Sequence, residues 1–328
     1  LGVRLLHPEV TTTAHPAQGH RRQPPNMDLP FLTLDVFTDH TFGGNPLGVF
    51  PNATHLPSDL MQRVAREMNL SETVFLGPPE SGGDARVRIF TPGKEVPFAG
   101  HPTVGSAIYV ASTLEHSPAD GTRTVVLEEN VGHVPVDVRF RDGDPVSARF
   151  TTAVLPEHRP SPVPAADLAR LVGLEASDLH PTLHPEMVSC GLPFYVVPIA
   201  SLGAIRRAVL DTPLWQRLVA PLWADHVYLI CPEAEGPDVD LHVRMFAPAV
   251  GVPEDPATGS AAAALGGYLS RVDGCEAGSL HWTLEQGLEI GRPSLLHVEA
   301  DRSGGATSAV RVGGSAVFVS RGFMSVPG

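Results

Sequence analysis

The spacing of apolar residues predicts many short strands and few helices. Residues 31–37 alternate between apolar and polar side chains, which is typical of a half-buried strand. The same pattern predicts further strands in the first half of the chain, at 43–51 (a turn running into a strand), 72–76, 85–92, 123–129, 133–140 and 146–152.

Helical spacing interrupts these strands at two places in the first half. Residues 58–69 place apolar side chains on one helix face behind Ser58, which is expected to be the N-cap. Residues 102–114 predict a second helix with Pro102 in its first turn, where a missing N–H is tolerated. Near the end of the chain, residues 307–324 predict a hairpin that could pair with either half.

Three segments of the second half resemble segments of the first half, in the same order. The offset between partners drifts slowly from 147 to 156 residues, as it does when loops change length. The pairs are 44–51 with 191–198 (sharing G-x-P-x-x-V-x-P), 71–80 with 224–233, and 88–97 with 244–253. We infer an internal duplication, hence two similar domains with a cleft between them, where small-molecule sites commonly lie.

The predicted organisation is an extension over residues 1–26, a first domain over 27–155 and a second over 156–328, whose last strands are free to pair with the first. The Pro-rich stretch 156–167 is the expected linker. Residues 1–26 are rich in Pro, His, Gln and Thr and lack an apolar signal segment, so they are expected to be disordered, with Met27 as the natural start.

Composition and charge narrow the function classes. The 328 residues are 42% hydrophobic and 18% charged, with a net charge of −13 and only 23 Lys and Arg residues. A basic surface for nucleic acid is not expected. Three widely spaced cysteines predict neither a disulfide framework nor a metal site, and no apolar run is long enough to span a membrane. These features favour a soluble, cytoplasmic protein.

The two copies differ most where their second helix begins. The first copy reads GHPTVGSA from Gly100, and the second reads EDPATGSAAA from Glu254. Helix N-termini carry free N–H groups and bind anions, so two of them in one cleft would suit a small carboxylate. Glu72 and His101 in the first copy, with Asp255 in the second, could supply general acid–base chemistry there.

Each of these residues also has an ordinary structural interpretation. Glu72 could lie on a solvated helix end, His101 could cap its helix, and Asp255 before proline is a common N-cap. The repeat gives Asp225 as the counterpart of Glu72. Phosphate-binding loops, HExxH and the GxSxG nucleophile motif are missing, so nucleotide, zinc-protease and serine-hydrolase functions are not indicated.

Several ordered motifs together resemble the PhzF family of phenazine-biosynthesis isomerase-like proteins. They are LDVFTDHTFGGNPLGVF, MNLSETVFL, RIFTPGKEVPFAGHPTVGSA, RMFAPAVGVPEDPATGSAAAALGGYL and EQGLEIGRPSLLHVEA, and the resemblance runs from about residue 29 to the C-terminus. It implies an α+β protein with the diaminopimelate epimerase-like fold, in which two pseudo-symmetric domains are each a barrel-like sheet around a central helix. The central helices would begin near Pro102 and Ala257.

The resemblance also implies the roles of individual residues. Glu72 would be the catalytic acid/base, with His101 and Asp255 as the other catalytic groups. The substrate-binding set would be Ser71, Gly100, Thr258, Gly259 and Ser260. No metal or organic cofactor is implied, the substrate would be a small carboxylate, and a homodimer is expected. In the phenazine enzyme, such a site isomerises a dihydro-hydroxyanthranilic acid by moving a proton between carbons.

Related epimerases use a cysteine at each helix start, but Cys190, Cys231 and Cys275 lie elsewhere in this sequence. A two-thiol mechanism is therefore not expected. The leading hypothesis is a cofactor-independent, PhzF-like isomerase. Two alternatives stay open: an amino-acid racemase or epimerase that uses Glu72 with Asp225 or Asp255, and a non-catalytic protein that binds small acids.

Overall fold

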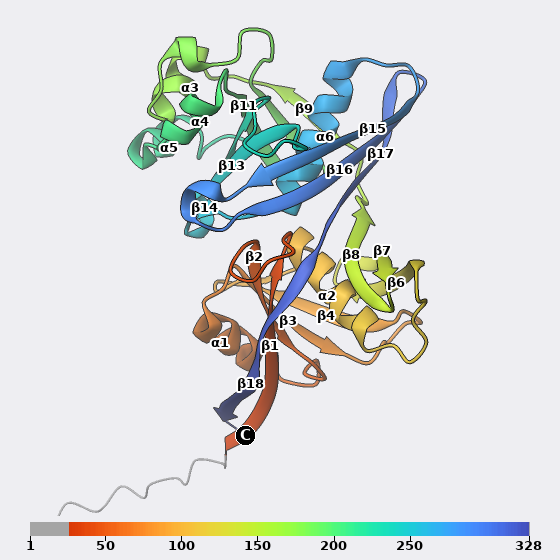
Figure 1. Cartoon of the computed structure of the whole chain (residues 1–328). Helices are drawn as coiled ribbons and strands as arrows, with labels where there is room; N and C mark the ends of the chain where they lie inside the picture. The colour runs from red at the N-terminus through yellow and green to blue at the C-terminus, as the bar shows by residue number, and fades with distance from the viewer. Residues whose placement is uncertain (1–25, 328) are drawn as a thin grey trace, which may run out of the picture.

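The computed structural model describes residues 26–327, which form two similar halves placed end to end (Figure 1). The extension predicted over residues 1–26 lies outside the described residues, apart from Asn26, which begins the first strand. In the described part of the chain, no helix is long and apolar enough to cross a lipid bilayer.

The first half contains eight strands and two helices in chain order. They are β1 (Asn26–Val36), β2 (Asn45–Phe50), α1 (Ser58–Met68), β3 (Glu72–Gly77), β4 (Ala85–Phe90), β5 (Glu95–Val96), α2 (Gly100–Ser112), β6 (Gly121–Glu129), β7 (Gly132–Arg141) and β8 (Asp144–Thr151).

The second half repeats this plan with extra helices. Its elements are β9 (Glu157–Pro160), α3 (Ala165–Leu171), η1 (Ala176–Asp178), β10 (Glu186–Ser189), β11 (Pro193–Pro198), α4 (Leu202–Arg207), α5 (Thr212–Leu218), β12 (His226–Cys231), β13 (Leu241–Ala247), η2 (Pro248–Val250), β14 (Val252–Asp255), α6 (Gly259–Asp273), β15 (Gly278–Gln286), η3 (Leu288–Ile290), β16 (Ser294–Ser303), β17 (Ala306–Gly314) and β18 (Ala316–Pro327).

Strand pairing confirms the duplication. In the first half, β1–β2 is antiparallel, β2–β3 parallel, β3–β4 antiparallel, β4–β6 parallel, and β6–β7 and β7–β8 antiparallel. The series β10, β11, β12, β13, β15, β16, β17 repeats these directions in the same order. In each half, the parallel pairs are connected through helices, as parallel strands require.

The register corrects one detail of the predicted repeat. Leu47 pairs with Glu72 in β2–β3, and its repeat partner Phe194 pairs with His226 in β11–β12. A one-residue slip would move every side chain to the opposite face of the strand. Tyr228 lies in the same central core as Val74, so the counterpart of Glu72 is His226, and the prediction of Asp225 was wrong.

The last two strands join the halves and do not form the predicted hairpin. β17 pairs with β16 and with β8, whereas β18 pairs antiparallel with β1 (Figure 1). Only Ser315 lies between β17 and β18, which leaves no room for a hairpin loop, and its carbonyl accepts a hydrogen bond from Phe37 N–H at 2.7 Å. The expected linker 156–167 contains β9, which pairs with β10.

Of the two predictions about helix starts, one is confirmed and the other is wrong. Pro102 lies in the first turn of α2, as the sequence predicted. Ser58 is not the N-cap of α1, because that position belongs to Pro57 and no side chain caps the helix. The Ser58 hydroxyl instead accepts a hydrogen bond from Arg88 Nη2 at 2.9 Å.

The helices α2 and α6 run through the centre of their own halves and are buried on nearly all sides. Small residues make this possible. A Cβ atom on Gly105 would lie 2.6 Å from Leu47 Cδ2, and one on Gly266 would lie 2.6 Å from Val298 Cγ1. A helix that is apolar on every side must be buried on every side, so the strands wrap around it.

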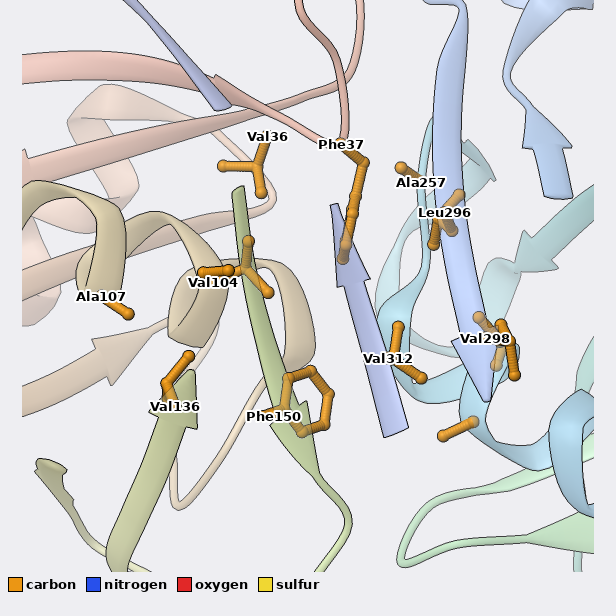
Figure 2. Packing of buried hydrophobic residues seen from close by; sticks show 14 of the residues in the cluster. Val36, Phe37, Val104, Ala107, Val136, Phe150, Ala257, Leu296, Val298 and Val312 are labelled. Carbon is orange, nitrogen blue, oxygen red and sulfur yellow. The ribbon is translucent and has the colours of Figure 1, made fainter. Parts of the chain in front are cut away.

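The first turns of the two central helices meet where the halves join. A Cβ atom on Gly100 would lie 3.0 Å from Gly259 Cα, so the two backbones are in direct contact. Phe37 fills the space beside them, between the two groups of core residues that Figure 2 shows. It is fully buried, and its backbone has a left-handed φ of 66°.

We expect Gly100→Ala to lower the free energy of unfolding by about 1–3 kcal/mol, because the new methyl group meets backbone that cannot move aside. The melting temperature measures this effect. Gly203→Ala in α4 is the control, since its new Cβ would meet only Arg207 Nη1 at 3.9 Å. Equal melting temperatures for the two variants would contradict a close-packed junction.

Candidate active site

The structure brings Glu72 and His101 together in the first half. Glu72 is the first residue of β3, and His101 lies in the first turn of α2. His101 Nε2 is 3.4 Å from Glu72 Oε2, and the His101 side chain is 6% exposed. This approach does not complete a hydrogen bond, and His101 Nε2 is buried without a hydrogen-bond partner among residues 26–327.

Asp255 reaches the site from the second half, at the end of β14. Its carboxylate accepts hydrogen bonds from Asn45 Nδ2 at 3.0 Å and from Thr258 Oγ1 at 2.5 Å. Asn45 also donates to the Ala257 carbonyl at 2.9 Å, so one amide from β2 ties two residues of the other half to the first. The predicted residues Asp255 and Thr258 therefore lie side by side.

Sequence reasoning missed Asn45 and Gln286. Gln286, the last residue of β15, donates to the Asp255 carbonyl at 2.8 Å and to Thr258 Oγ1 at 3.0 Å. Asn45 did leave a signal in the sequence. The repeat aligns it with Leu192, so a polar residue stands in one copy where the other copy has an apolar one.

Burial controls the protonation of the site. It raises the pKa of Glu72 to about 8, and the nearby Asp255 carboxylate adds to the rise. Burial lowers the pKa of His101 to about 3. It also raises the pKa of Asp255 to about 6, against hydrogen bonds from Thr258, Asn45 and Ser71. At neutral pH, Glu72 therefore holds a proton, His101 is uncharged and Asp255 is ionised.

Neither central helix has a side-chain cap from the residue that precedes it. The residues that precede the two helices, Ala99 and Thr258, make no side-chain cap on α2 or α6. The first N–H groups of a helix have no partner within the helix, and they carry partial positive charge. Gly100, Gly259 and Ser260 are therefore placed to present backbone donors beside Glu72 and Asp255.

Unpartnered polar atoms mark the surroundings of the site. Within the described part of the chain, Asn45 Oδ1, the Tyr228 hydroxyl and His101 Nε2 are buried without hydrogen-bond partners. Burial and the Asp255 charge both raise the pKa of Tyr228, so β12 also faces Asp255. Buried polar groups normally have partners, which makes these atoms candidates for contact with a substrate.

Asp225 lies apart from the arrangement around Glu72. Its carboxylate is 3.1 Å from His226 Nδ1, and its carbonyl accepts from Trp215 Nε1 at 2.7 Å. Cys190 Sγ donates to the Ala263 carbonyl at 3.4 Å, and burial raises its pKa to about 12, which makes it a poor nucleophile. Neither residue is placed to act beside Glu72.

Two cavities, of about 220 and 260 Å³, are lined mainly by residues of β6, β7, β8, β15, β16 and β17, and they share Arg149 and His297. Their lining includes none of Glu72, His101 and Asp255.

Among residues 26–327, no three His, Cys, Asp or Glu side chains gather in a way that could hold a metal ion.

Residues 34–322 match the family model of phenazine biosynthesis-like proteins, PhzC–PhzF. This chain belongs to that family. An uncharacterized isomerase of Mesorhizobium japonicum is 41% identical over 89% of this chain and 97% of its own. The trans-2,3-dihydro-3-hydroxyanthranilate isomerase of Pseudomonas aeruginosa is 36% identical over 89% of this chain and 98% of its own.

Solved structures of the PhzF family confirm the predicted fold. A PhzF-family protein of Bacillus anthracis superposes with a TM-score of 0.83 at 25% identity, covering 91% of this chain and 99% of its own. A probable proline racemase of Agrobacterium radiobacter shares the fold alone, at a TM-score of 0.60 and 13% identity over 90% of this chain and 92% of its own. The predicted family and isomerase class are confirmed.

The Asp255 charge should be visible in the titration of Glu72. We expect ¹³C NMR to show the Glu72 carboxyl titrating near pH 8, and Asp255→Asn to lower that pKa while burial keeps it above 4.5. Asp225→Asn is the matched control and should leave Glu72 unchanged. An unaltered Glu72 midpoint in Asp255→Asn would contradict the coupling between the halves.

Proposed function

We propose that this PhzF-family protein is a cofactor-independent isomerase that moves a proton on a small cyclic carboxylic acid. The observation that carries the proposal is the position of Glu72. Its carboxyl group, with a pKa raised to about 8, lies beside His101 and shares the junction of two uncapped helix starts with Asp255. A catalytic acid/base works best with a pKa near the working pH.

In the proposed reaction, the ionised form of Glu72 accepts a proton from one carbon of the substrate. The electron pair left behind is delocalised through the ring, and the protonated Glu72 carboxyl group, whose proton can exchange with solvent, then delivers a proton to a second carbon. Atoms and electrons balance within the substrate, so the step needs neither an oxidant nor an organic cofactor. Backbone N–H groups at Gly100, Gly259 and Ser260 would hold the substrate carboxylate.

The other two groups bind and orient the substrate in this proposal. Uncharged His101 offers Nε2, which is buried without a partner, to a polar group near the reacting carbon. Ionised Asp255 would accept a hydrogen bond from an amino or hydroxyl substituent, with Asn45 and Thr258 fixing its carboxylate. Ser71, next to Glu72, contributes a further hydrogen bond to Asp255.

The relatives guide the choice of substrate class. The Pseudomonas aeruginosa relative is named for trans-2,3-dihydro-3-hydroxyanthranilate, a ring that bears a carboxylate, an amino group and a hydroxyl group. A carboxylate at the helix starts and a donor at Asp255 would suit such a ring. We therefore propose a substrate of this kind for the present protein.

The first test is solvent deuterium incorporation. The protein is incubated in heavy water with trans-2,3-dihydro-3-hydroxyanthranilate and a panel of amino and hydroxy acids, and mass spectrometry follows the exchange. Glu72→Gln should reduce exchange by at least about 100-fold, because it removes the base. Glu67→Gln, on the exposed side of α1, is the control. Full exchange in Glu72→Gln would refute the assigned role.

The proposed role of Glu72 also fixes the sign of the pH dependence. Only ionised Glu72 can accept a proton, so kcat/KM should rise with pH and level off above about pH 8. In Asp255→Asn, the midpoint of this rise should move to lower pH. A kcat/KM that is flat between pH 6 and pH 9 would contradict the proposal.

A further inference from the structure

Glu129, at the end of β6, is a buried carboxyl group next to the central helix α2. It is 5% exposed, and its Oε1 lies 2.7 Å from Thr103 Oγ1 in the first turns of α2. Its other oxygen, Oε2, is buried without a hydrogen-bond partner among the described residues. An ionised carboxylate in this place would leave half of its charge unsolvated.

The number of hydrogen bonds at the Thr103 hydroxyl indicates whether Thr103 or Glu129 is the donor in their contact. Thr103 Oγ1 is also 2.8 Å from the Ala99 carbonyl, which can only accept. A threonine hydroxyl has one hydrogen, so it cannot donate to both the carbonyl and Glu129. Both contacts are satisfied if Glu129 carries a proton and donates it to Thr103, which then donates to Ala99.

In the second half, the residue equivalent to Glu129 is a donor to a threonine hydroxyl, although that threonine, Thr258, precedes α6 whereas Thr103 lies within α2. Gln286 is the repeat counterpart of Glu129, because Arg86 pairs with Glu128 in β4–β6 as His242 pairs with Glu285 in β13–β15. The Gln286 amide donates to Thr258 Oγ1 at 3.0 Å, and that hydroxyl donates to Asp255 Oδ2 at 2.5 Å.

We propose that Glu129 works as a neutral carboxylic acid that donates to Thr103 and thereby positions the first turn of α2, which carries His101. It is a positioning residue, because it acts on the site through the helix. The consequence for catalysis rests on the function proposed above, whereas the hydrogen-bond chain Glu129–Thr103–Ala99 is a property of the folded protein.

The neighbouring Glu128 shows what an ionised carboxylate requires in this fold. Burial alone would raise its pKa, but backbone N–H groups of Glu80, Gly83 and Ser81 hydrogen-bond its carboxylate, and its pKa is lowered to about 2. Among the described residues, no backbone N–H group donates to the Glu129 carboxyl group. Two consecutive glutamates therefore have opposite protonation states.

The charges around Glu129 do not reverse this result. Charged and titratable groups on the surrounding elements include Arg86 and Arg88 on β4, Glu95 on β5, His101 and Tyr109 on α2, His133 on β7 and Glu128 on β6 itself. Burial raises the pKa of Glu129 to about 8, against smaller opposing effects of Thr103 and Arg86. The Arg86 guanidinium donates to the carbonyls of Glu128 and Val87 and to Asn130 Oδ1, and not to Glu129.

The test compares the pH dependence of the melting temperature of wild type and Glu129→Gln. Glutamine donates at every pH, whereas Glu129 in the folded protein binds a proton that the unfolded chain releases near pH 4.5. The melting temperature of wild type should therefore fall, relative to that of Glu129→Gln, by about 2 °C for each pH unit from about pH 5 to about pH 8. Parallel curves would overturn the proposal.

Gln286→Glu is the matched reverse variant. It places a carboxyl group at the equivalent position. The melting temperature of Gln286→Glu should therefore fall more steeply with rising pH than that of wild type, whereas the melting temperature of Glu129→Gln should fall less steeply. Glu128→Gln is the local control, because a carboxylate is needed there and its loss should lower the melting temperature at neutral pH. A Gln286→Glu curve parallel to wild type would contradict the shared donor role.

Activity adds a second measurement at pH 7, with the deuterium-exchange assay. Glu129→Leu should lower kcat more than it raises KM, and Glu129→Gln should restore most of that loss because it restores the donor. Equal kcat in Glu129→Leu and wild type would overturn the positioning role. If no substrate is turned over at all, the proposed function fails, while the melting curves still decide whether Glu129 is a neutral donor.

Discussion

The contact between Gly100 and Gly259 is the constraint on which the rest of the structure depends. Two buried helices begin backbone against backbone, at a distance that leaves no room for a side chain. This contact brings His101 and Ser260, each the second residue of its helix, to one place. It also lets Asn45 from one half hold Asp255 of the other, so the site exists only when the halves are joined.

The two halves share the same arrangement of strands and helices, but they carry chemically different side chains at equivalent positions of the site. Equivalent positions carry Glu72 and His226, His101 and Ser260, and Glu129 and Gln286. The ion pairs that support the frame are kept in both halves, since Arg88 with Glu95 and Arg244 with Glu254 both form bidentate bridges. The ion-paired side chains that support the sheets are therefore alike in the two halves, whereas the side chains around the site differ.

Burial is the largest electrostatic effect on the ionisable groups of the site. It keeps Glu72 and Glu129 protonated and His101 uncharged at neutral pH, and leaves Asp255 as the ionised group among them. A carboxyl group with a raised pKa is a stronger base once it ionises than an ordinary carboxylate. The same desolvation that costs stability therefore gives Glu72 a pKa suited to proton transfer.

The sequence by itself predicted most strands and both helices of the first half, the duplication and the candidates Glu72, His101 and Asp255, because periodicity and repeated motifs are local properties. Only the tertiary structure decided the pairing of β18 with β1, the counterpart of Glu72 and the roles of Asn45, Gln286 and Glu129. Register, burial and the number of donors around a hydroxyl depend on residues far apart in the chain. A protonated glutamate cannot be told from an ionised one until the groups that surround it are known.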